Sequence, residues 1–288
     1  MNRPVKRVGV IYHPKIPAAK ALSERLSEVL PSMRASAWAC SSWDEEDMRT
    51  QLQDTDLVIS VGGDGTILRV ARAVAFQNIP IVGVNLGHLG FMTEFSADDL
   101  LEKLPAVLCG EGWIDQRTML QVDLSSETNG RTDKGLPRSF HALNDVLIGR
   151  GSVPRIIQVS AAVNGAPLTT YRADGVIIAT ATGSTGYSLA AGGPILFPQA
   201  EEIMVTPVSA HLSLSYALVL PSTAVVEMQV HTYHEAVLSV DGQINLALQD
   251  GDRITAKRSQ QGARFLRMYP RDFFYSALEQ RLRVKVRD

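Results

Sequence analysis

The strongest chemical signal in the sequence is the segment GGDGT at Gly62–Thr66, which directly follows the apolar run Leu57–Val61. In an open parallel sheet, ligands bind beyond the carboxyl ends of the strands, and this segment would lie at such an end. Glycines there let backbone N–H groups approach phosphate oxygens, and the following helix adds the positive end of its dipole. The motif therefore predicts a phosphate-binding turn.

The side chains of this turn add further chemistry. Asp64 would project a carboxylate into an anion site, which is unfavourable unless the carboxylate engages a hydroxyl group or a cation. Thr66 is a candidate N-terminal cap for the helix, and Arg69 is spaced to reach a phosphate. The same residues are also compatible with a tight strand–helix turn that binds no ligand.

Two more segments could surround a polar ligand. DGVIIATATGSTGYS at Asp174–Ser188 leads from an apolar run into small hydroxyl residues and glycines, and the Tyr187 ring is suited to a nucleotide. Asn144 and Asp145 stand between apolar residues, where burying them is unfavourable without a partner such as a ribose diol. A Ser/Thr/Gly turn and an Asx turn explain the two segments equally well.

Other kinds of site are excluded or weak. No G-x-x-x-x-G-K-[ST] run is present, so the sequence has no P-loop. Leu68 stands where a dinucleotide fingerprint needs its third glycine or alanine, which weakens a hydride-transfer function. His231 and His234 would face opposite sides of a strand, and the chain has only two cysteines, so no zinc site is expected.

The first hundred residues alternate between strand and helix patterns. Short apolar runs at Val8–Tyr12, Leu57–Val61 and Ile81–Val84 predict buried parallel strands. Pro31 is expected to stop the first helix, and Ser96 is expected to cap the last. The predicted helices cover residues 18–30, 66–76 and 97–108. This alternation predicts a Rossmann-like parallel sheet with helices on both faces.

From Gly110–Trp113 to about residue 270 the helical periodicity largely fades, and short strands separated by Asn-Gly and Asp-Gly turns replace it. Ser125–Arg138 is expected to be an exposed loop, and Asp272–Arg283 an amphipathic helix that returns to the N-terminal domain. The predicted strands are 120–124, 146–148, 156–163, 175–180, 212–220, 225–231, 236–240 and 253–256. The sequence thus predicts an α/β domain at 1–110 with the tail 271–288, and a β-rich, β-sandwich-like domain at 111–270.

Composition sets further limits. The 288 residues include 28 Lys+Arg and 30 Asp+Glu, a net charge of −2, which argues against nucleic acid as the main partner. No apolar run is long enough for a membrane helix, and the N-terminus lacks the apolar core of a signal peptide, so a cytoplasmic protein is expected. Of the 22 glycines, six lie within residues 62–90 and five within 174–193, where tight turns or a close ligand would need them.

Taken in order, these segments resemble the NAD kinase family over nearly the full length of the chain. The resemblance rests on GGDGT at 62–66, VNLGHLGFMTEF at 84–95, Asn144-Asp145, DGVIIATATGSTGYSLAAGGP at 174–194 and Asp241-Gly242-Gln243. Similar GGDGT turns occur in phosphofructokinases and in diacylglycerol and sphingosine kinases, whereas the long 174–194 motif singles out NAD kinases. The family phosphorylates the 2′-hydroxyl of the adenosine ribose of NAD, using ATP or, in some members, polyphosphate, with a divalent metal.

The resemblance also implies roles for individual residues. Asp64 looks like the catalytic carboxylate, Gly65 lies beside the same ribose, and Asn144 and Asp145 would hold the adenosine, with Asp145 on the ribose diol. Further residues implied to bind NAD are Arg69, Arg155, Arg172, Asp174, Thr185, Gly186, Tyr187, Ser188, Leu189, Ala190 and Gln243. Residues implied to bind the ATP phosphates are Gly62, Gly63, Gly65 and Thr66. Mg²⁺ is expected to accompany ATP, with no residue assigned to it, and the chain is expected to self-associate as a dimer or tetramer.

The sequence departs from the family pattern at four positions. Ala181 replaces a proline, Gly186 replaces an alanine, Ala190 stands where serine is common, and Asp145 stands where glutamate is more frequent. These differences bear on affinity and on NAD-versus-NADH preference and leave the reaction class in place. Two other functions stay open, a lipid or sugar kinase that shares the GGDGT turn and an NAD(H)-sensing protein without activity.

Overall fold

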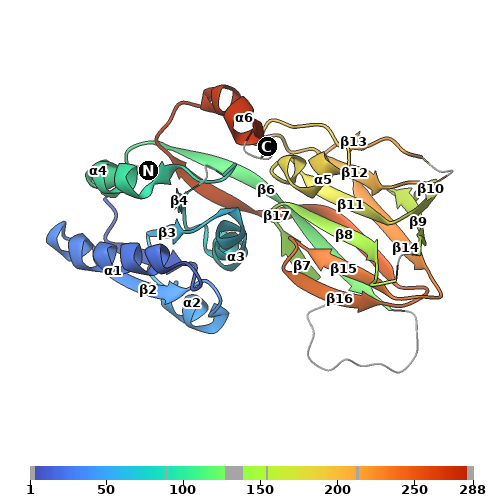
Figure 1. The fold of residues 1–288 in the computed structure, drawn as a ribbon, viewed down its shortest axis with the longest axis horizontal. Helices are drawn as coiled ribbons and strands as arrows, with labels where there is room; N and C mark the ends of the chain where they lie inside the picture. The colour runs from blue at the N-terminus through green and yellow to red at the C-terminus, as the bar shows by residue number, and fades with distance from the viewer. Residues whose placement is uncertain (1–3, 88–89, 127–138, 154, 212–213, 284–288) are drawn as a thin grey trace. The chain divides into compact units, whose positions relative to one another are not determined.

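The computed structural model of the protein describes residues 4–87, 90–126, 139–153, 155–211 and 214–283 (Figure 1). The chain forms two compact units. Unit 1 consists of residues 1–116 and 263–288, and unit 2 consists of residues 117–262. The functional boundaries predicted from the sequence, 1–110 with 271–288 and 111–270, stay a prediction.

A parallel sheet forms the centre of unit 1. Its main strands follow the order β4-β3-β1-β2, and the short β5 lies beside β4. The strands are β1 (Arg7–Tyr12), β2 (Ser36–Ser41), β3 (Leu57–Val61), β4 (Ile81–Asn85) and β5 (Phe95–Ser96). Every residue of β3 and β4 is buried, as expected for central strands whose two faces are both covered.

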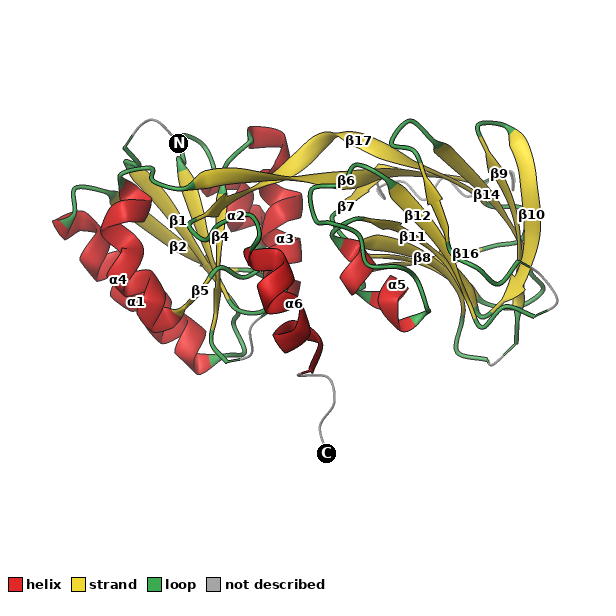
Figure 2. Ribbon diagram, turned by 90° about the horizontal axis from the view of Figure 1, so that it is seen from above, coloured by secondary structure: helices red, strands yellow, loops and turns green. Residues whose placement is uncertain are grey.

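Helices cover both faces of this sheet. Figure 2 shows α1 and α4 on one face and α3 on the other. The helices of unit 1 are α1 (Pro17–Ser32), α2 (Glu45–Gln51), α3 (Asp64–Val74), the 3₁₀ turn η1 (Ala75–Gln77), α4 (Ala97–Leu108) and α6 (Phe273–Arg283). Leu26 of α1 and Leu104 of α4 are fully buried in one core with Val10 and Ile59 of the sheet. In the described part of the chain, the helices lack the length and apolar character needed to cross a membrane.

The helix boundaries in unit 1 partly follow the sequence patterns. Ser96 caps α4 as predicted, and its hydroxyl exchanges hydrogen bonds with Asp99 in a capping box. The expected stop at Pro31 is wrong, because α1 continues to Ser32; a proline in the last turn removes only one helical N–H. Thr66 is not the cap of α3, since Gly63 occupies that position and the helix already begins at Asp64.

Unit 2 is built from β-strands. One antiparallel sheet has the order β13-β12-β11-β8-β15-β16, and a second group of strands pairs in the order β10-β9-β14-β17. The strands are β6 (Trp113–Ser125), β7 (Ser139–Ala142), β8 (Asp145–Arg150), β9 (Ile157–Val163), β10 (Ala166–Ala173), β11 (Gly175–Thr180), β12 (Ile203–Val208), β13 (Leu218–Leu220), β14 (Val225–His231), β15 (Ala236–Val240), β16 (Ile244–Leu248) and β17 (Arg253–Arg267). A 3₁₀ turn η2 (Gly183–Thr185) and a short helix α5 (Tyr187–Ala190) follow β11.

The two groups of strands in unit 2 enclose one apolar core. Val146 and Ile178 from the first sheet lie in the same buried cluster as Val159, Val226 and Ile254 from the second group. This packing is that of a β-sandwich, so the predicted fold class is confirmed for both units. The strands β6 and β17 contribute residues to both units.

The predictions for unit 2 missed several details. The strand predicted at 212–220 is wrong in extent, because only Leu218–Leu220 is a strand among its described residues. The exposed β10 and the proline-containing β12 were not predicted, since neither shows a regular apolar pattern. Most of the predicted loop Ser125–Arg138 lies outside the described residues. The predicted Asp241-Gly242 turn is confirmed, with φ values of 51° and 65°.

Candidate active site

Asp64 is the first residue of α3, and only Gly62 and Gly63 separate it from the end of β3. The Phe91 amide donates a hydrogen bond to Asp64 Oδ2 at 3.0 Å, and the Met92 amide donates to Oδ1 at 3.2 Å. Each oxygen therefore has one fixed backbone donor and keeps a lone pair for another group. The carboxylate is held in one orientation and can still accept a hydrogen bond from a ligand hydroxyl.

Gly90 explains why the backbone can come so close to this carboxylate. A Cβ atom added at Gly90 would overlap the Asp64 carboxylate, so a larger residue there would push the 90–92 segment away. The sequence contained this signal in the stretch VNLGHLGFMTEF, but no role was predicted for Gly90.

A buried ion-pair network holds the segment that carries these two amides. Arg267 Nη1 donates to the Met92 carbonyl at 2.9 Å and to Glu94 Oε2 at 3.1 Å, while its Nε donates to Asp115 at 3.1 Å. The side chains of Arg267, Glu94 and Asp115 are all at least nine-tenths buried, so each charge is paired and hydrogen-bonded. The sequence analysis did not identify these residues, because nothing in their spacing shows that they meet.

The glycines of the GGDGT turn divide into two groups. A Cβ atom at Gly62 would overlap the Thr66 side chain, so this glycine allows the tight turn. A Cβ atom at Gly63 or Gly65 would meet no described atom within 4 Å, so these two exposed glycines border open space. The start of α3 thus presents accessible backbone and the positive end of the helix dipole, which suits a phosphate.

Two further residues of the predicted phosphate site lie on α3. The hydroxyl of Thr66 is buried and has no hydrogen-bond partner among the described residues. Arg69 is half-buried on the same helix. All the residues of unit 1 that were predicted to bind phosphate therefore lie in the turn between β3 and α3 or in the first two turns of α3.

In unit 2, Asn144 and Asp145 lie at the start of β8, where residues 183–186 pack against them. A Cβ atom at Gly183 would overlap the Asn144 carbonyl oxygen. A Cβ atom at Gly186 would lie 3.6 Å from Asp145 Oδ2 and 3.7 Å from Asn144 Nδ2. The structure thus brings the predicted pair together with Gly186 of the long second motif.

The electrostatics at this point are unusual. Asp145 is 8% exposed, and burial, together with the negative charge of Asp241, raises the pKa of its carboxyl from 3.8 to about 7. The side-chain oxygen of Asn144 is buried and has no hydrogen-bond partner in the described structure. A buried amide oxygen and a carboxyl group that titrates near neutrality are both suited to a ligand that supplies hydroxyl or N–H donors.

The two glycines near this pair allow a matched test. Gly183→Ala is expected to weaken NAD binding at least about tenfold, because the added methyl group must displace the Asn144 backbone. Gly186→Ala makes the smaller steric change at the same site: its methyl group would lie 3.2 Å from the Gly183 carbonyl oxygen, a contact that a shift of a few tenths of an ångström relieves, so a smaller loss of NAD affinity is expected. Calorimetry with NAD measures both variants, and equal affinities would contradict the proposed role of the 183–186 packing.

Of the remaining residues of the second motif, Thr185 is buried in η2, where its hydroxyl donates to the Thr182 carbonyl at 3.3 Å, and residues 187–190 form α5. The Ser188 hydroxyl is buried and hydrogen-bonded to Thr206 at 2.9 Å, whereas Tyr187 is 46% exposed. Ala190 is exposed at the end of the helix, and Leu189 is half-buried. Gln243 follows the β15–β16 turn, close in sequence to Asp241, and its amide donates to the Val240 carbonyl.

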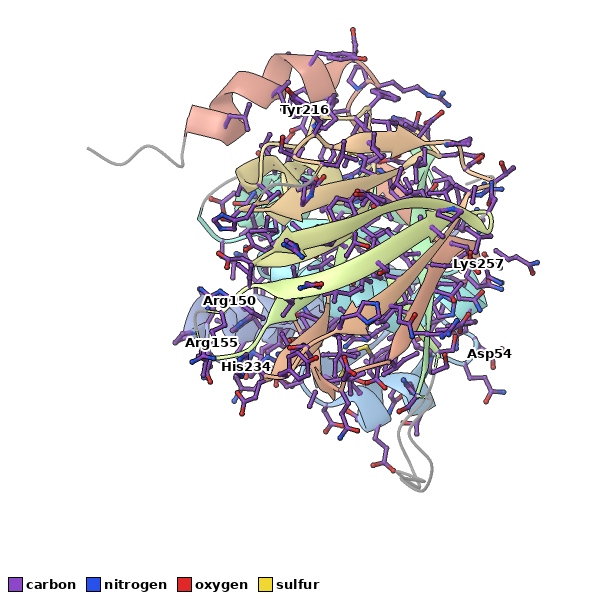
Figure 3. All side chains as sticks on the ribbon, turned by 90° about the vertical axis from the view of Figure 1, so that its right-hand side faces the viewer. Asp54, Arg150, Arg155, Tyr216, His234 and Lys257 are labelled. Carbon is purple, nitrogen blue, oxygen red and sulfur yellow. The ribbon has the colours of Figure 1, made fainter. Side chains whose placement is uncertain are left out.

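Three residues predicted to bind NAD, namely Arg155, Arg172 and Asp174, lie away from Asn144 and Asp145 within unit 2. Asp174 forms an ion pair at 3.0 Å with Arg150, which lies at the opposite end of β8 from Asp145. The five residue steps from Asp145 to Arg150 span roughly 17 Å. Arg155 Nη1 lies 2.9 Å from His234 Nε2, and both residues are labelled in Figure 3. Arg172 lies near the end of β10, two residues before Asp174.

Within the described ranges, no group of three or more His, Cys, Asp or Glu side chains is arranged to hold a metal ion. We therefore assign no residue to a metal.

Comparison with known proteins places this arrangement in a family. The model of the ATP-NAD kinase N-terminal domain matches residues 8–111, and that of the ATP-NAD kinase C-terminal domain matches residues 143–268. The chain belongs to the NAD kinase family. The NAD kinase of Dehalococcoides mccartyi strain CBDB1 is 45% identical over 278 residues, covering 96% of each chain, and that of Chloroflexus aurantiacus strain J-10-fl is 41% identical over 280 residues, covering 97% and 99%.

Solved structures of NAD kinases share the fold. Yeast NADH kinase in complex with NADH has a TM-score of 0.79 at 26% identity, covering 96% of this chain and 87% of that one. An NAD kinase from Archaeoglobus fulgidus in complex with ATP has a TM-score of 0.74 at 26% identity, covering 96% and 98%. The predicted family and the predicted enzyme class, a phosphotransferase, are confirmed, while the roles of single residues stay predictions.

Proposed function

We propose that this NAD kinase family member transfers the terminal phosphoryl group of ATP to the 2′-hydroxyl of the adenosine ribose of NAD and so forms NADP. The observation that carries the proposal is the Asp64 carboxylate, which two backbone amides orient at the start of α3 beside the exposed Gly63 and Gly65. Phosphoryl transfer to an alcohol requires an oriented group that accepts the hydrogen bond of that alcohol, next to a turn that binds the phosphates.

Asp64 would act on the reacting hydroxyl group. Its carboxylate accepts the hydrogen bond of the 2′-hydroxyl and aligns the oxygen with the terminal phosphorus of ATP. As the new P–O bond forms, the carboxylate takes the proton, the bond between the terminal phosphorus and the bridging oxygen breaks, and ADP leaves. A carboxylate is a weak base for an alcohol, so alignment contributes more than early deprotonation. The backbone of Gly63 and Gly65, together with Gly62, which shapes the turn, would bind the ATP phosphates. Thr66 would contribute through its hydroxyl, because its backbone amide donates to the Gly63 carbonyl at 2.9 Å.

We assign NAD binding to the residues that the family resemblance implies. Asn144 and Asp145 would hold the adenosine, with Asp145 on the ribose diol. The resemblance also implies that Gly65 lies beside the ribose and that Arg69 contacts the substrate. The further proposed NAD contacts are Arg155, Arg172, Asp174, Thr185, Gly186, Tyr187, Ser188, Leu189, Ala190 and Gln243. The complexes of the yeast enzyme with NADH and of the archaeal enzyme with ATP support the two substrate classes.

The remaining assignments follow the family resemblance. We propose that Mg²⁺ enters with ATP. We also propose that the protein acts in the cytoplasm as a homodimer or homotetramer. Size-exclusion chromatography with light scattering measures the oligomeric state.

A donor and acceptor assay tests the proposed function. The purified protein is incubated with NAD and ATP, then with NAD and polyphosphate, and NADP is measured by enzymatic cycling. We expect NADP from ATP. Product from a sugar or from diacylglycerol, with none from NAD, would support the other kinase function, and calorimetric binding of NAD without any product would support a sensor.

A further inference from the structure

We propose that Asp241 is a positioning residue for NAD binding: its carboxylate holds the Leu143–Asp145 backbone in the conformation that presents the Asn144 and Asp145 side chains to the adenosine. The proposal rests on the proposed function, because it takes those two side chains as the adenosine contacts. No role in the site was predicted for Asp241 beyond its place in the Asp241-Gly242-Gln243 motif.

The first observation is a carboxylate that accepts three consecutive backbone amides. Asp241 Oδ1 accepts from the Asn144 amide at 2.8 Å and from the Asp145 amide at 3.2 Å, while Oδ2 accepts from the Leu143 amide at 3.0 Å. Asp241 is 7% exposed, so these hydrogen bonds to a charged group are shielded from water. A carboxylate suits these three amides, because both of its oxygens are acceptors.

The second observation is that the carbonyl groups of the same segment are also held. The Thr180 hydroxyl donates to the Leu143 carbonyl at 2.6 Å, and the Thr180 amide donates to the Asn144 carbonyl at 2.9 Å. The Asp241 amide donates to the Asp145 carbonyl at 2.9 Å. All six backbone polar groups of residues 143–145 are thus paired, and the backbone does not compete with a ligand for the two side chains.

The third observation concerns what this arrangement leaves available. The Asn144 side-chain oxygen is buried, and none of the described residues donates a hydrogen bond to it. Burying an amide oxygen in this way is unfavourable unless a ligand supplies the missing donor. A backbone fixed at six points beside an unsatisfied acceptor is the arrangement of a preorganised binding site.

The β15–β16 turn explains how Asp241 reaches this segment. Asp241 and Gly242 both have positive φ values, 51° and 65°, and lie in the hairpin loop 241–243 between the paired residues Val240 and Ile244. β15 pairs with β8 so that Val240 lies opposite Val146, which places the turn beside the residues that precede β8. A residue with a short polar side chain tolerates this conformation, and only an acidic one also supplies an acceptor for all three amides.

Asp241→Asn tests the proposal with little change in shape. The amide keeps one acceptor but turns an N–H donor toward the backbone amides, so the 143–145 segment must move. We expect the Kd for NAD, measured by calorimetry without ATP, to rise at least about tenfold, the loss of about one hydrogen bond to a charged group. The KM for ATP should stay within about threefold of the wild-type value, because unit 1 carries the phosphate turn.

Asp252→Asn is the matched control. Asp252 is 4% exposed, lies at the turn before β17 in the same unit, and accepts the Gln249 amide at 2.8 Å. We expect this variant to bind NAD within about twofold of the wild type, even where its thermal midpoint falls as far as that of Asp241→Asn. An equal loss of NAD affinity in both variants would assign the effect to stability and overturn the proposal.

A double-mutant cycle separates positioning from a general structural role. If Asp241 acts through the adenosine contacts, Asp241→Asn should weaken NAD binding much less in an Asn144→Ala, Asp145→Ala background than in the wild type. Additive losses would overturn the proposal. Should Asp241→Asn not fold, Thr180→Val removes the hydroxyl that holds Leu143 from the other side and is expected to raise the Kd for NAD in the same way. Unchanged affinity in that variant would also overturn it.

These measurements are independent of turnover. A wild-type protein that binds NAD but forms no NADP would contradict the proposed reaction and leave the positioning role to be decided by the ratio of Kd values. A wild-type protein that forms NADP while Asp241→Asn binds NAD within about twofold would contradict the positioning role alone.

Discussion

Asp64→Asn is expected to lower turnover by about 10²- to 10⁴-fold, the range that a positioned acid or base contributes. The substitution removes the proton acceptor. It also turns an N–H donor toward the Phe91 or Met92 amide, each of which donates to a carboxylate oxygen in the wild type. Affinity for NAD should stay within a few-fold, because the adenosine contacts are assigned to unit 2. Steady-state kinetics and calorimetry measure the two quantities separately.

Asp56→Asn provides the matched control for that experiment. Asp56 Oδ2 accepts the amides of Lys6 and Arg7 at 2.9 and 3.1 Å, so this carboxylate also binds two backbone amides in unit 1. It lies before β3, whereas Asp64 lies after it. We expect Asp56→Asn to retain wild-type turnover. Near-normal turnover in Asp64→Asn would remove Asp64 from the mechanism, and an equal loss in both variants would point to unfolding.

Asp145→Asn is expected to stabilise the protein above pH 7 while it weakens NAD binding. Burial and Asp241 raise the pKa of the folded-state carboxyl from 3.8 to about 7. An acid with a raised pKa binds its proton more tightly in the folded state, so its contribution to stability is complete below pH 3.8 and is lost as the pH rises to about 7. At about 1.4 kcal/mol per pH unit, the wild type loses up to about 4 kcal/mol over this window.

Urea unfolding of both proteins at pH 4, 6 and 8 measures this effect. The free energy of unfolding of the wild type should fall across the series relative to that of Asp145→Asn, which cannot ionise at this position. The difference in favour of the variant should be largest at pH 8. Parallel pH profiles for the two proteins would contradict a buried carboxyl that titrates near neutrality.

Asp145→Asn is thus expected to raise the stability of the free protein and to weaken NAD binding, and such opposite effects are common at binding sites. A carboxyl buried beside a second carboxylate is unfavourable in the free protein, and it persists where a ligand makes use of it. The same holds for the unpaired oxygen of Asn144. Asn144 and Asp145, the two polar residues between apolar runs in the sequence, therefore each lower the stability of the free protein.

The sequence alone predicted the sheet of unit 1 and the location of its functional turn, because both depend on local patterns. Leu57–Val61 is an unbroken apolar run and forms a fully buried central strand, and the turn that follows it has the glycines of a close approach. By contrast, β2 (Ser36–Ser41) was missed, since it lies at the edge of the sheet and only one of its residues is buried. Edge strands lack the apolar pattern that identifies central ones.

Contacts between residues distant in sequence could not be predicted. Asp64 and Phe91 are 27 residues apart, and Asp241 and Asn144 are 97 apart, so neither hydrogen bond leaves a periodic signal. The predicted site residues were the ones expected to touch a ligand. Those that hold them, Gly90 and Asp241 among them, became visible only in the folded chain, although both lie in stretches on which the family resemblance rests.

The position of the new phosphate tests the central claim most directly. The protein is incubated with NAD and ATP, and the product is examined by proton and phosphorus NMR, which distinguish a phosphate on the 2′-oxygen of the adenosine ribose from one on any other hydroxyl. We predict a single product, NADP with its phosphate on the 2′-oxygen. A phosphate on another hydroxyl, or no phosphorylated NAD from a protein that is folded and binds both substrates, would contradict the account.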